Sequence, residues 1–301
     1  MASGRVWTVH EALDWTVGHF QRKDAEAPRR SAEWLLSAAT GLSRVELYAH
    51  HDRLLSDEER ARLRASVERR AAGEPLQYVT GEMPFRHLVL KVRQGVFIPR
   101  PETEVLVDEV LAALPPAIPG AAGGSGPVVV DLCTGSGAVA LSVAQERPDA
   151  RVFATELAPQ IADVARENAA RCGLAERVTV LTGDLFAPLP AELAGQVDVV
   201  AANPPYIPTA DLPDLPAEVA GFEPRLALDG GVDGLDSVRR IVDDAGAWLR
   251  PGGTLVVETD TSCAKDAARL VAAWYEGTRV VSDLTGRDRV VTGRTQEANE
   301  R

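Results

Sequence analysis

The segment with the clearest chemistry directly follows an apolar run at residues 197–202, and it reads Asn203-Pro204-Pro205-Tyr206. Neither proline has a backbone N–H and both fix φ, so the turn is stiff and its carbonyl groups stay free. The side-chain oxygen of Asn203 and the carbonyl of Pro204 can therefore accept both hydrogens of a planar –NH2 group, with Tyr206 against its flat face. Such a grip aims the nitrogen lone pair at an electrophilic methyl group without a strong base. Taken alone, the tetrapeptide also fits an ordinary strand-terminating turn.

A second candidate site is a glycine-rich turn that joins a buried strand to a helix. The strand expected at 128–132 is followed by Cys133, Thr134, Gly135, Ser136 and Gly137. In a parallel sheet the ligand crevice lies at the carboxyl ends of the strands, where small residues let the backbone approach a ligand. Glu156 ends the next strand and can hold two ribose hydroxyls, while Asp184 and Leu185 follow the third and can bind an adenine ring. These features predict a nucleoside-containing cofactor.

Spacing alone leaves the choice of cofactor open. A dinucleotide fingerprint requires Gly-x-Gly-x-x-Gly, and the third glycine position is Ala140 here. The acid four residues before the first glycine, Asp131, instead resembles the turn that binds S-adenosylmethionine, in which the acid and the backbone receive the amino-acid end of the cofactor. We favour S-adenosylmethionine on that resemblance.

The elements that must position these residues change in character along the chain. Residues 1–73 predict a small helical domain, because capping boxes at 8–11 and 56–59 mark helix starts. Residues 74–98 contain β-rich runs at 77–80 and 88–92 and predict a bridging hairpin. From residue 99 strands alternate with helices, which is typical of βαβ units and a mostly parallel sheet. We expect strands at 128–132, 151–156, 178–182, 197–202 and 254–259, and helices at 138–147, 158–172 and 235–250.

Local sequence signals predict the structure of four further segments. Runs at 279–283 and 289–292 flank a turn and predict antiparallel strands at one edge of the sheet. The Pro/Gly-rich residues 115–127 predict a loop, and residues 296–301 a loose tail.

Composition excludes several other classes of protein. The chain has 301 residues, 45% hydrophobic and 25% charged, which suits a globular protein of about two domains. No apolar run approaches the roughly 20 residues of a membrane span, and no signal peptide is visible, so we expect a cytosolic protein. The cysteines lie far apart and no histidine has metal-ligand spacing, so we expect free thiols and no metal site.

Charge is distributed unevenly between the two parts of the chain. Residues 1–73 contain 12 basic and 11 acidic residues, and since the whole chain has a net charge of −12, residues 74–301 carry −13. An acidic field of this size repels phosphate backbones and disfavours broad duplex binding. It favours a cationic small molecule instead.

These motifs together resemble those of the HemK-type release factor glutamine methyltransferases. The likeness covers nearly the whole chain, and it includes the segments PLQYVTGE at 75–82, IPRPETE at 98–104 and EPRLAL at 223–228. The resemblance implies an α/β fold with a Rossmann-like S-adenosylmethionine-dependent methyltransferase sheet, a small N-terminal helical domain and a bridging β-hairpin. It implies a helical domain at 1–73 for substrate recognition, a hairpin linker at 74–98 and a methyltransferase domain at 99–301.

The activity implied by the resemblance is transfer of a methyl group from S-adenosylmethionine to the side-chain amide nitrogen of the glutamine in the Gly-Gly-Gln motif of class 1 peptide chain release factors, which modulates translation termination. The cofactor-binding residues carried over are Cys133, Thr134, Gly135, Ser136, Gly137, Glu156, Asp184, Leu185 and Asn203. The substrate-binding residues are Asn203, Pro204, Pro205 and Tyr206, of which Asn203, Pro204 and Tyr206 are catalytic. We expect a release factor as partner, no direct nucleic-acid or membrane partner, a cytoplasmic location and a monomer.

Several positions depart from the family pattern. Cys133 stands where glycine is common, and at positive φ it would bear about 1–2 kcal/mol of strain and lower the cofactor affinity. Leu185, often an aromatic residue in relatives, would pack on adenine without stacking. The run at 258–260, Glu-Thr-Asp, replaces Glu-Ile-Gly, and Cys263 stands where glutamine is common. What the family does at these last positions is open here.

Two rival functions remain at this point. The sequence Asn-Pro-Pro-Tyr is shared with adenine-N6 and guanine-N2 methyltransferases, so a nucleic-acid amino methyltransferase is one alternative. The acidic charge and the lack of a basic, aromatic-interleaved module oppose it. The departures at Cys133 and Asp260 motivate the other alternative, a non-catalytic protein that retains the crevice. Turnover that is lost in an Asn203→Ala variant would exclude it.

Overall fold

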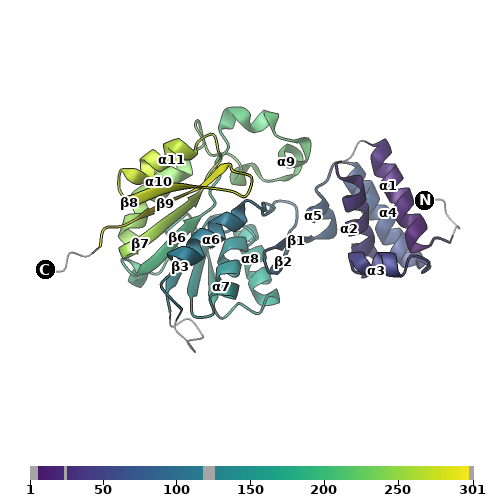
Figure 1. The fold of residues 1–301 in the computed structure, drawn as a ribbon, viewed down its shortest axis with the longest axis horizontal. Helices are drawn as coiled ribbons and strands as arrows, with labels where there is room; N and C mark the ends of the chain where they lie inside the picture. The colour runs from purple at the N-terminus through teal and green to yellow at the C-terminus, as the bar shows by residue number, and fades with distance from the viewer. Residues whose placement is uncertain (1–5, 24–25, 118–125, 298–301) are drawn as a thin grey trace. The chain divides into compact units, whose positions relative to one another are not determined.

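Seven strands form one sheet in the order β5-β4-β3-β6-β7-β9-β8 (Figure 1). The computed structural model describes residues 6–23, 26–117 and 126–297. The strands are β3 (Val128–Leu132), β4 (Arg151–Glu156), β5 (Val178–Thr182), β6 (Val197–Ala202), β7 (Leu249–Glu258), β8 (Glu276–Ser282) and β9 (Asp288–Arg294). The strands β3 to β7 are parallel, and β9 runs antiparallel to β7 and β8. The predicted parallel sheet with antiparallel strands at one edge is confirmed.

The order of strand addition reverses at β3. The chain places β4 and β5 on one side of β3 and then returns to place β6 and β7 on the other. Such a switch point leaves a crevice at the carboxyl ends of the strands, where ligands bind. Leu132 of β3 pairs with Ala202 of β6, which pairs with Val257 of β7. The residues that come next on these adjacent strands are Cys133, Asn203 and Glu258.

Helices cover both faces of the sheet (Figure 1). One face packs against α6 (Thr103–Ala113), α7 (Ala138–Glu146) and α8 (Pro159–Arg171), and the other against α10 (Asp236–Trp248) and α11 (Ala264–Ala272). Alternate strand residues serve the two faces, since Val129 lies in the core with α7 and Val130 in the core with α10. Burial on both faces explains the nearly continuous apolar strand sequences. The helices α6 and α11 were not predicted.

The helical region forms a unit of its own, made of Met1–Glu82 together with Pro216–Phe222. Its helices are α1 (Val9–Arg22), α2 (Pro28–Thr40), α3 (Arg44–Ala49), α4 (Asp57–Ala71), α5 (Leu76–Thr80) and α9 (Ala217–Phe222). Both predicted capping boxes form, and a third joins Ser43 to Glu46. The predicted helices of this region are confirmed.

The expectation of a strand at 77–80 is wrong, because this run lies in α5. Gly81 ends the helix with a left-handed φ of 80°, and its N–H donates to the carbonyl of Gln77 at 2.8 Å. The neighbouring residues Tyr78 and Val79 are both buried, which a helix allows and the alternation of a half-buried strand does not. Aromatic and β-branched residues favoured a strand locally, but packing against the other helices decides the structure.

The hairpin is therefore shorter than expected and consists of β1 (Glu82–Phe85) and β2 (Leu88–Lys91). Arg86 occupies its turn, with ion pairs to Asp108 of α6 at 2.7 Å and to Glu146 of α7 at 2.6 Å. These contacts attach the hairpin turn to the helices beside the large sheet.

Two of the predicted segments lie partly outside the described residues. Residues 118–125 of the expected loop and 298–301 of the expected tail lie outside the described residues. Short 3-10 turns occur at Ala191–Leu193, Thr209–Asp214 and Arg225–Ala227. Within the described ranges, no helix has the length and apolar character needed to cross a membrane.

Candidate active site

The turn after β3 is held in shape by the buried carboxylate of Asp131. Its Oδ2 accepts a hydrogen bond from the Thr134 hydroxyl at 2.6 Å and one from the backbone N–H of Ala140, in α7, at 3.1 Å. Burial raises the pKa of Asp131 to about 7. Both contacts lie within the turn and its helix, so Asp131 fixes the path of the backbone that a ligand would meet.

Alternate residues of this turn have left-handed backbone conformations. The φ angles of Cys133, Gly135 and Gly137 are 56°, 57° and 88°. The condition for strain at Cys133 is thus met, at a cost of about 1–2 kcal/mol. A Cβ added at Gly135 would find no atom within 4 Å, and the buried hydroxyl of Ser136 has no hydrogen-bond partner among the described residues. The turn therefore has free space beside the backbone of Gly135 and a Ser136 hydroxyl without a partner among the described residues, and both features suit a polar ligand.

Glu156, at the end of β4, reaches this turn from the neighbouring strand. Its Oε2 accepts a hydrogen bond from the N–H of Gly135 at 3.0 Å, and its Oε1 accepts one from the N–H of Ala158 at 3.1 Å. Burial raises the pKa of Glu156. Each carboxylate oxygen keeps a further lone pair, so the group can still accept hydrogen bonds from the hydroxyls of a ligand.

Asp184, in the loop after β5, has an ion-pair partner that the sequence did not indicate. Asp184 forms an ion pair with Arg240 of α10, with 2.6 Å between Oδ2 and the guanidinium nitrogen. Leu185 has a φ of 46° and is 7% exposed, within the apolar core that includes α10. A ligand amino group at Asp184 would share the carboxylate with Arg240. An arginine on a helix surface gives no sequence signal of such a pairing.

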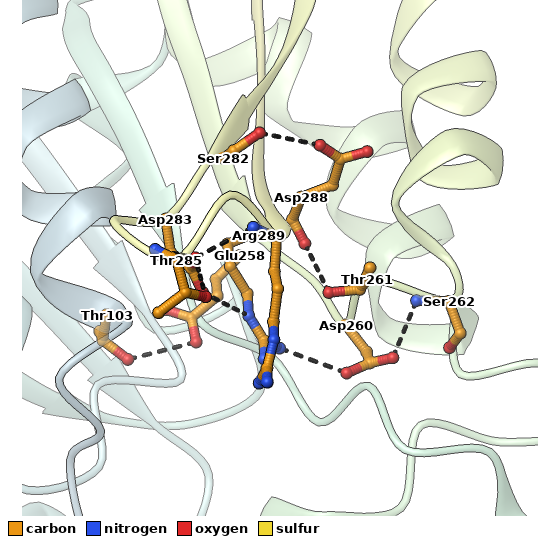
Figure 2. A network of polar contacts seen from close by, with 11 residues as sticks. Thr103, Glu258, Asp260, Thr261, Ser262, Ser282, Asp283, Thr285, Asp288 and Arg289 are labelled. Carbon is orange, nitrogen blue, oxygen red and sulfur yellow. Dashed lines mark hydrogen bonds and ion pairs between the residues drawn. The ribbon is translucent and has the colours of Figure 1, made fainter.

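The Asn203–Tyr206 turn leaves β6 at the same edge of the sheet as the glycine-rich turn, as the strand register requires. The Nδ2 of Asn203 donates to the hydroxyl of Thr103 at 3.2 Å, and that hydroxyl donates to Oε1 of Glu258 at 3.2 Å (Figure 2 shows the second contact). Burial raises the pKa of Glu258 to about 7 and also raises that of Tyr206. Thr103 and Glu258 both lie in sequence motifs, but no role was predicted for either residue.

A glycine loop packs closely on the backbone of the tetrapeptide. A Cβ on Gly234 would lie 2.3 Å from the carbonyl oxygen of Tyr206, and one on Gly230 would lie 2.8 Å from that of Pro205. The N–H of Gly230 also donates to the carbonyl of Ile207 at 2.8 Å. The sequence shows these glycines, but only the structure shows what they pack against.

Two of the family segments meet through a buried ion pair. Arg100, of the segment at 98–104, pairs with Glu223, of the segment at 223–228, whose side chain is 1% exposed. The second carboxylate oxygen of Glu223 accepts a hydrogen bond from the N–H of Ile98 at 3.3 Å. Since a buried carboxylate requires partners, this pairing also connects the segment at 98–104 to the loop that follows the tetrapeptide.

Arg289, near the start of β9, connects the ends of three segments (Figure 2). Its guanidinium lies 3.2 Å from Asp260 and 3.4 Å from Asp283. Hydrogen bonds from Thr285 and Arg287 lower the pKa of Asp283 to about 2. Asp260, one of the departures from the family pattern, is therefore part of an ion-pair network here.

Two family models match parts of this chain. Residues 11–81 match the family model described as the PrmC N-terminal domain, and residues 129–222 match the model of a methyltransferase domain. The matched domain and the parallel sheet with its switch-point crevice define a methyltransferase with a Rossmann-like fold, and the predicted fold class is confirmed.

Full-length relatives identify the family. The release factor glutamine methyltransferase of Moorella thermoacetica is 46% identical over 285 residues, which covers 94% of this chain and 96% of the relative. The proteins of that name from Geobacter sulfurreducens and Bifidobacterium longum are each 43% identical, over 96% and 93% of this chain and 97% of each relative. The chain belongs to the family of release factor glutamine methyltransferases, as the sequence motifs predicted.

Proposed function

We propose that this protein transfers a methyl group from S-adenosylmethionine to the side-chain amide nitrogen of the glutamine in the Gly-Gly-Gln motif of class 1 release factors. The observation that carries the proposal is the similarity to proteins named release factor glutamine methyltransferase, which reaches 46% identity over 94% of the chain. An Asn-Pro-Pro-Tyr turn beside a glycine-rich turn at one sheet edge supports a reaction at an –NH2 group.

The residues of the glycine-rich turn suit S-adenosylmethionine, which supplies an electrophilic methyl group on a sulfonium when bound. Cys133 to Gly137 would hold its amino-acid end through open backbone and the unused Ser136 hydroxyl. Glu156 would accept hydrogen bonds from the ribose hydroxyls, and Asp184 and Leu185 would receive the adenine. The net charge of −13 on residues 74–301 also suits a cationic ligand.

Asn203 and Pro204 would hold the target amide. The Oδ1 of Asn203 and the carbonyl of Pro204 accept its two N–H groups, and Tyr206 covers its flat face. The nitrogen lone pair, otherwise delocalised into the carbonyl, is then aimed at the methyl group. As the nitrogen bonds the methyl carbon, the bond from that carbon to the sulfonium sulfur would break to leave a neutral thioether, and the nitrogen would lose one proton to solvent as the product leaves. Alignment and exclusion of water supply the rate.

We also propose that the helical domain contacts the release factor. Its surface exposes apolar side chains, among them Val45 of α3, which is 78% exposed, and Leu54, which is 60% exposed. An aspartate at Val45 is expected to raise KM for a full-length release factor and to leave KM for a short Gly-Gly-Gln peptide unchanged. Equal effects on both substrates would contradict this role. We propose that the protein acts in the cytoplasm, because the proposed substrate acts in translation termination, and that one chain is the active unit.

Mass spectrometry tests the proposed reaction. Incubation of the protein with S-adenosylmethionine and a release factor is expected to add the mass of one methylene group to the peptide that contains Gly-Gly-Gln. A release factor with alanine in place of that glutamine serves as the control and should stay unmodified. Modification that persists in this control, or methylation of DNA or ribosomal RNA in place of the protein, would refute the proposal.

A further inference from the structure

The proposed binding of the substrate amide requires one particular orientation of the Asn203 side-chain amide. An amide side chain carries an acceptor at one end and a donor at the other, and half a turn about its last bond exchanges them. Only the orientation with Oδ1 toward the substrate can accept a hydrogen from the target –NH2. The opposite orientation places N–H against N–H. A neighbouring group must therefore select one of the two orientations.

Thr103 is the residue in position to do so. Its hydroxyl has a single hydrogen and lies between Asn203 and Glu258, with 3.2 Å to Nδ2 of the first and 3.2 Å to Oε1 of the second. An ionised carboxylate can only accept, so the Thr103 hydrogen is committed to Glu258. The Thr103 oxygen can then only accept, and the end of the Asn203 amide that faces it must be the donor. This leaves Oδ1 directed away from Thr103.

Burial makes this chain of hydrogen bonds rigid. Thr103 is 2% exposed and Glu258 is 1% exposed, and they belong to a helix and a strand rather than to loops. Bulk water therefore does not compete for the Thr103 hydroxyl. A β-branched threonine has few χ1 rotamers, which further restricts where its oxygen can lie.

Two charged groups from different elements act on the carboxyl of Glu258. Arg289 of β9 favours the ionised carboxylate, while Glu102, just before α6, opposes it. The hydroxyl of Thr103 stabilises the ionised form by donating to Oε1. Arg289 is itself held by Asp260 and Asp283, as Figure 2 shows.

We propose that Thr103 and Glu258 are positioning residues, which act through a hydrogen-bond relay to hold the Asn203 amide with its oxygen toward the target glutamine. The inference deepens the proposed function and rests on it for the role of Asn203. It gives a physical reason for the threonine in the segment at 98–104 and for the glutamate that ends β7.

Kinetics of threonine variants provide the first test. Thr103→Val keeps the shape but removes the hydroxyl, and we expect kcat to fall by at least about tenfold while KM for S-adenosylmethionine changes by less than about twofold. Thr103→Ser keeps the hydroxyl and should restore most of kcat. Thr16→Val, at another buried threonine in α1, is the matched control and should behave as wild type. Full activity in Thr103→Val would overturn the relay, and so would a Thr103→Ser variant as slow as Thr103→Val.

The pH profile tests the role of Glu258. Because burial raises its pKa to about 7, kcat of the wild type should rise with pH through that value as the ionised carboxylate fixes the relay. Glu258→Gln can donate as well as accept, so it should lower kcat and remove this rise. A Glu258→Gln profile with the same rise as wild type would overturn the assignment.

An NMR measurement tests the hydrogen-bond relay independently of which substrate the protein methylates. The side-chain amide signal of Asn203 in the NMR spectrum of the full chain, assigned by its loss in Asn203→Asp, should shift with pH in the wild type and stop shifting in Glu258→Gln. If the chemical shift of this signal does not change with pH in the wild type, and the Glu258→Gln substitution does not change it either, the relay is overturned whatever the substrate is. A responding signal in a protein that fails to methylate a release factor supports the relay and overturns only the proposed function.

Discussion

Replacing Asp131 by asparagine should change how the stability of the protein depends on pH. Both hydrogen bonds to this side chain end on one oxygen, at 2.6 and 3.1 Å, so the Oδ1 of an asparagine can accept both. Burial raises the pKa of Asp131 from 3.8 to about 7. Between those values the folded protein keeps a proton that the unfolded chain has lost, so wild-type stability falls as the pH rises through this window.

The size of the change in the free energy of unfolding follows from the difference between the pKa values of Asp131 in the unfolded and the folded protein. One pKa unit corresponds to about 1.4 kcal/mol, so the shift of Asp131 corresponds to about 4 kcal/mol in the free energy of unfolding. The D131N variant lacks this dependence. Its stability relative to wild type should therefore rise by about that amount between pH ~4 and ~7 and stay level above pH ~7.

Urea unfolding followed by circular dichroism, at pH steps across this window, measures the difference. Effects that do not depend on pH, such as the different strengths of the two side chains as acceptors, shift the whole curve and leave its slope unchanged. Titration of groups that do not interact with Asp131, Glu258 included, occurs in both proteins and cancels. A constant difference between D131N and wild type at all pH values would refute the assignment of a buried, proton-retaining carboxyl.

Three further predictions concern the proposed site. Asn203→Ala should remove most methyl transfer without changing the circular dichroism spectrum or Tm; substantial residual turnover would contradict its role. Cys133→Gly relieves about 1–2 kcal/mol of left-handed strain that is present without a ligand, so urea unfolding should show a higher free energy of unfolding, and a lower one would show that the thiol itself contributes to packing. Gly234→Ala places a Cβ 2.3 Å from the Tyr206 carbonyl oxygen and should lower kcat more than cofactor affinity, whereas Gly221→Ala, with no atom within 4 Å, is the control that should stay active. Equal activity in the two glycine variants would argue against the packing described for the tetrapeptide.

The parts of the fold that follow from local chemistry were predictable from the sequence. The strands β3 to β6 have the predicted bounds, and the apolar runs of β3 and β6 reflect burial on both faces of the sheet. Cys133 and Asn203 were expected at one edge because parallel strands share a direction, and the register places them on adjacent strands. The helix at 76–80 was missed because its aromatic and β-branched residues favour a strand until packing is considered.

Contacts between residues far apart in the chain could not be predicted. The pairing of Asp184 with Arg240 and the contact of Asn203 with Thr103 join residues from different elements, and single side chains give no pattern of such contacts. Periodicity and spacing describe one element at a time. The roles of Thr103 and Arg240 therefore required the structure, although the motif around Thr103 was visible in the sequence.

The shared register of β3, β6 and β7 limits how this protein can evolve. Side chains alternate between the faces of a strand, so deleting one residue inside β6 would turn Asn203 to the opposite face and remove it from Thr103. Insertions in the loops that lead into these strands, at the opposite edge of the sheet from the site, carry no such penalty. We therefore expect that homologues differ in length between the strands, and that the spacing within each strand stays fixed.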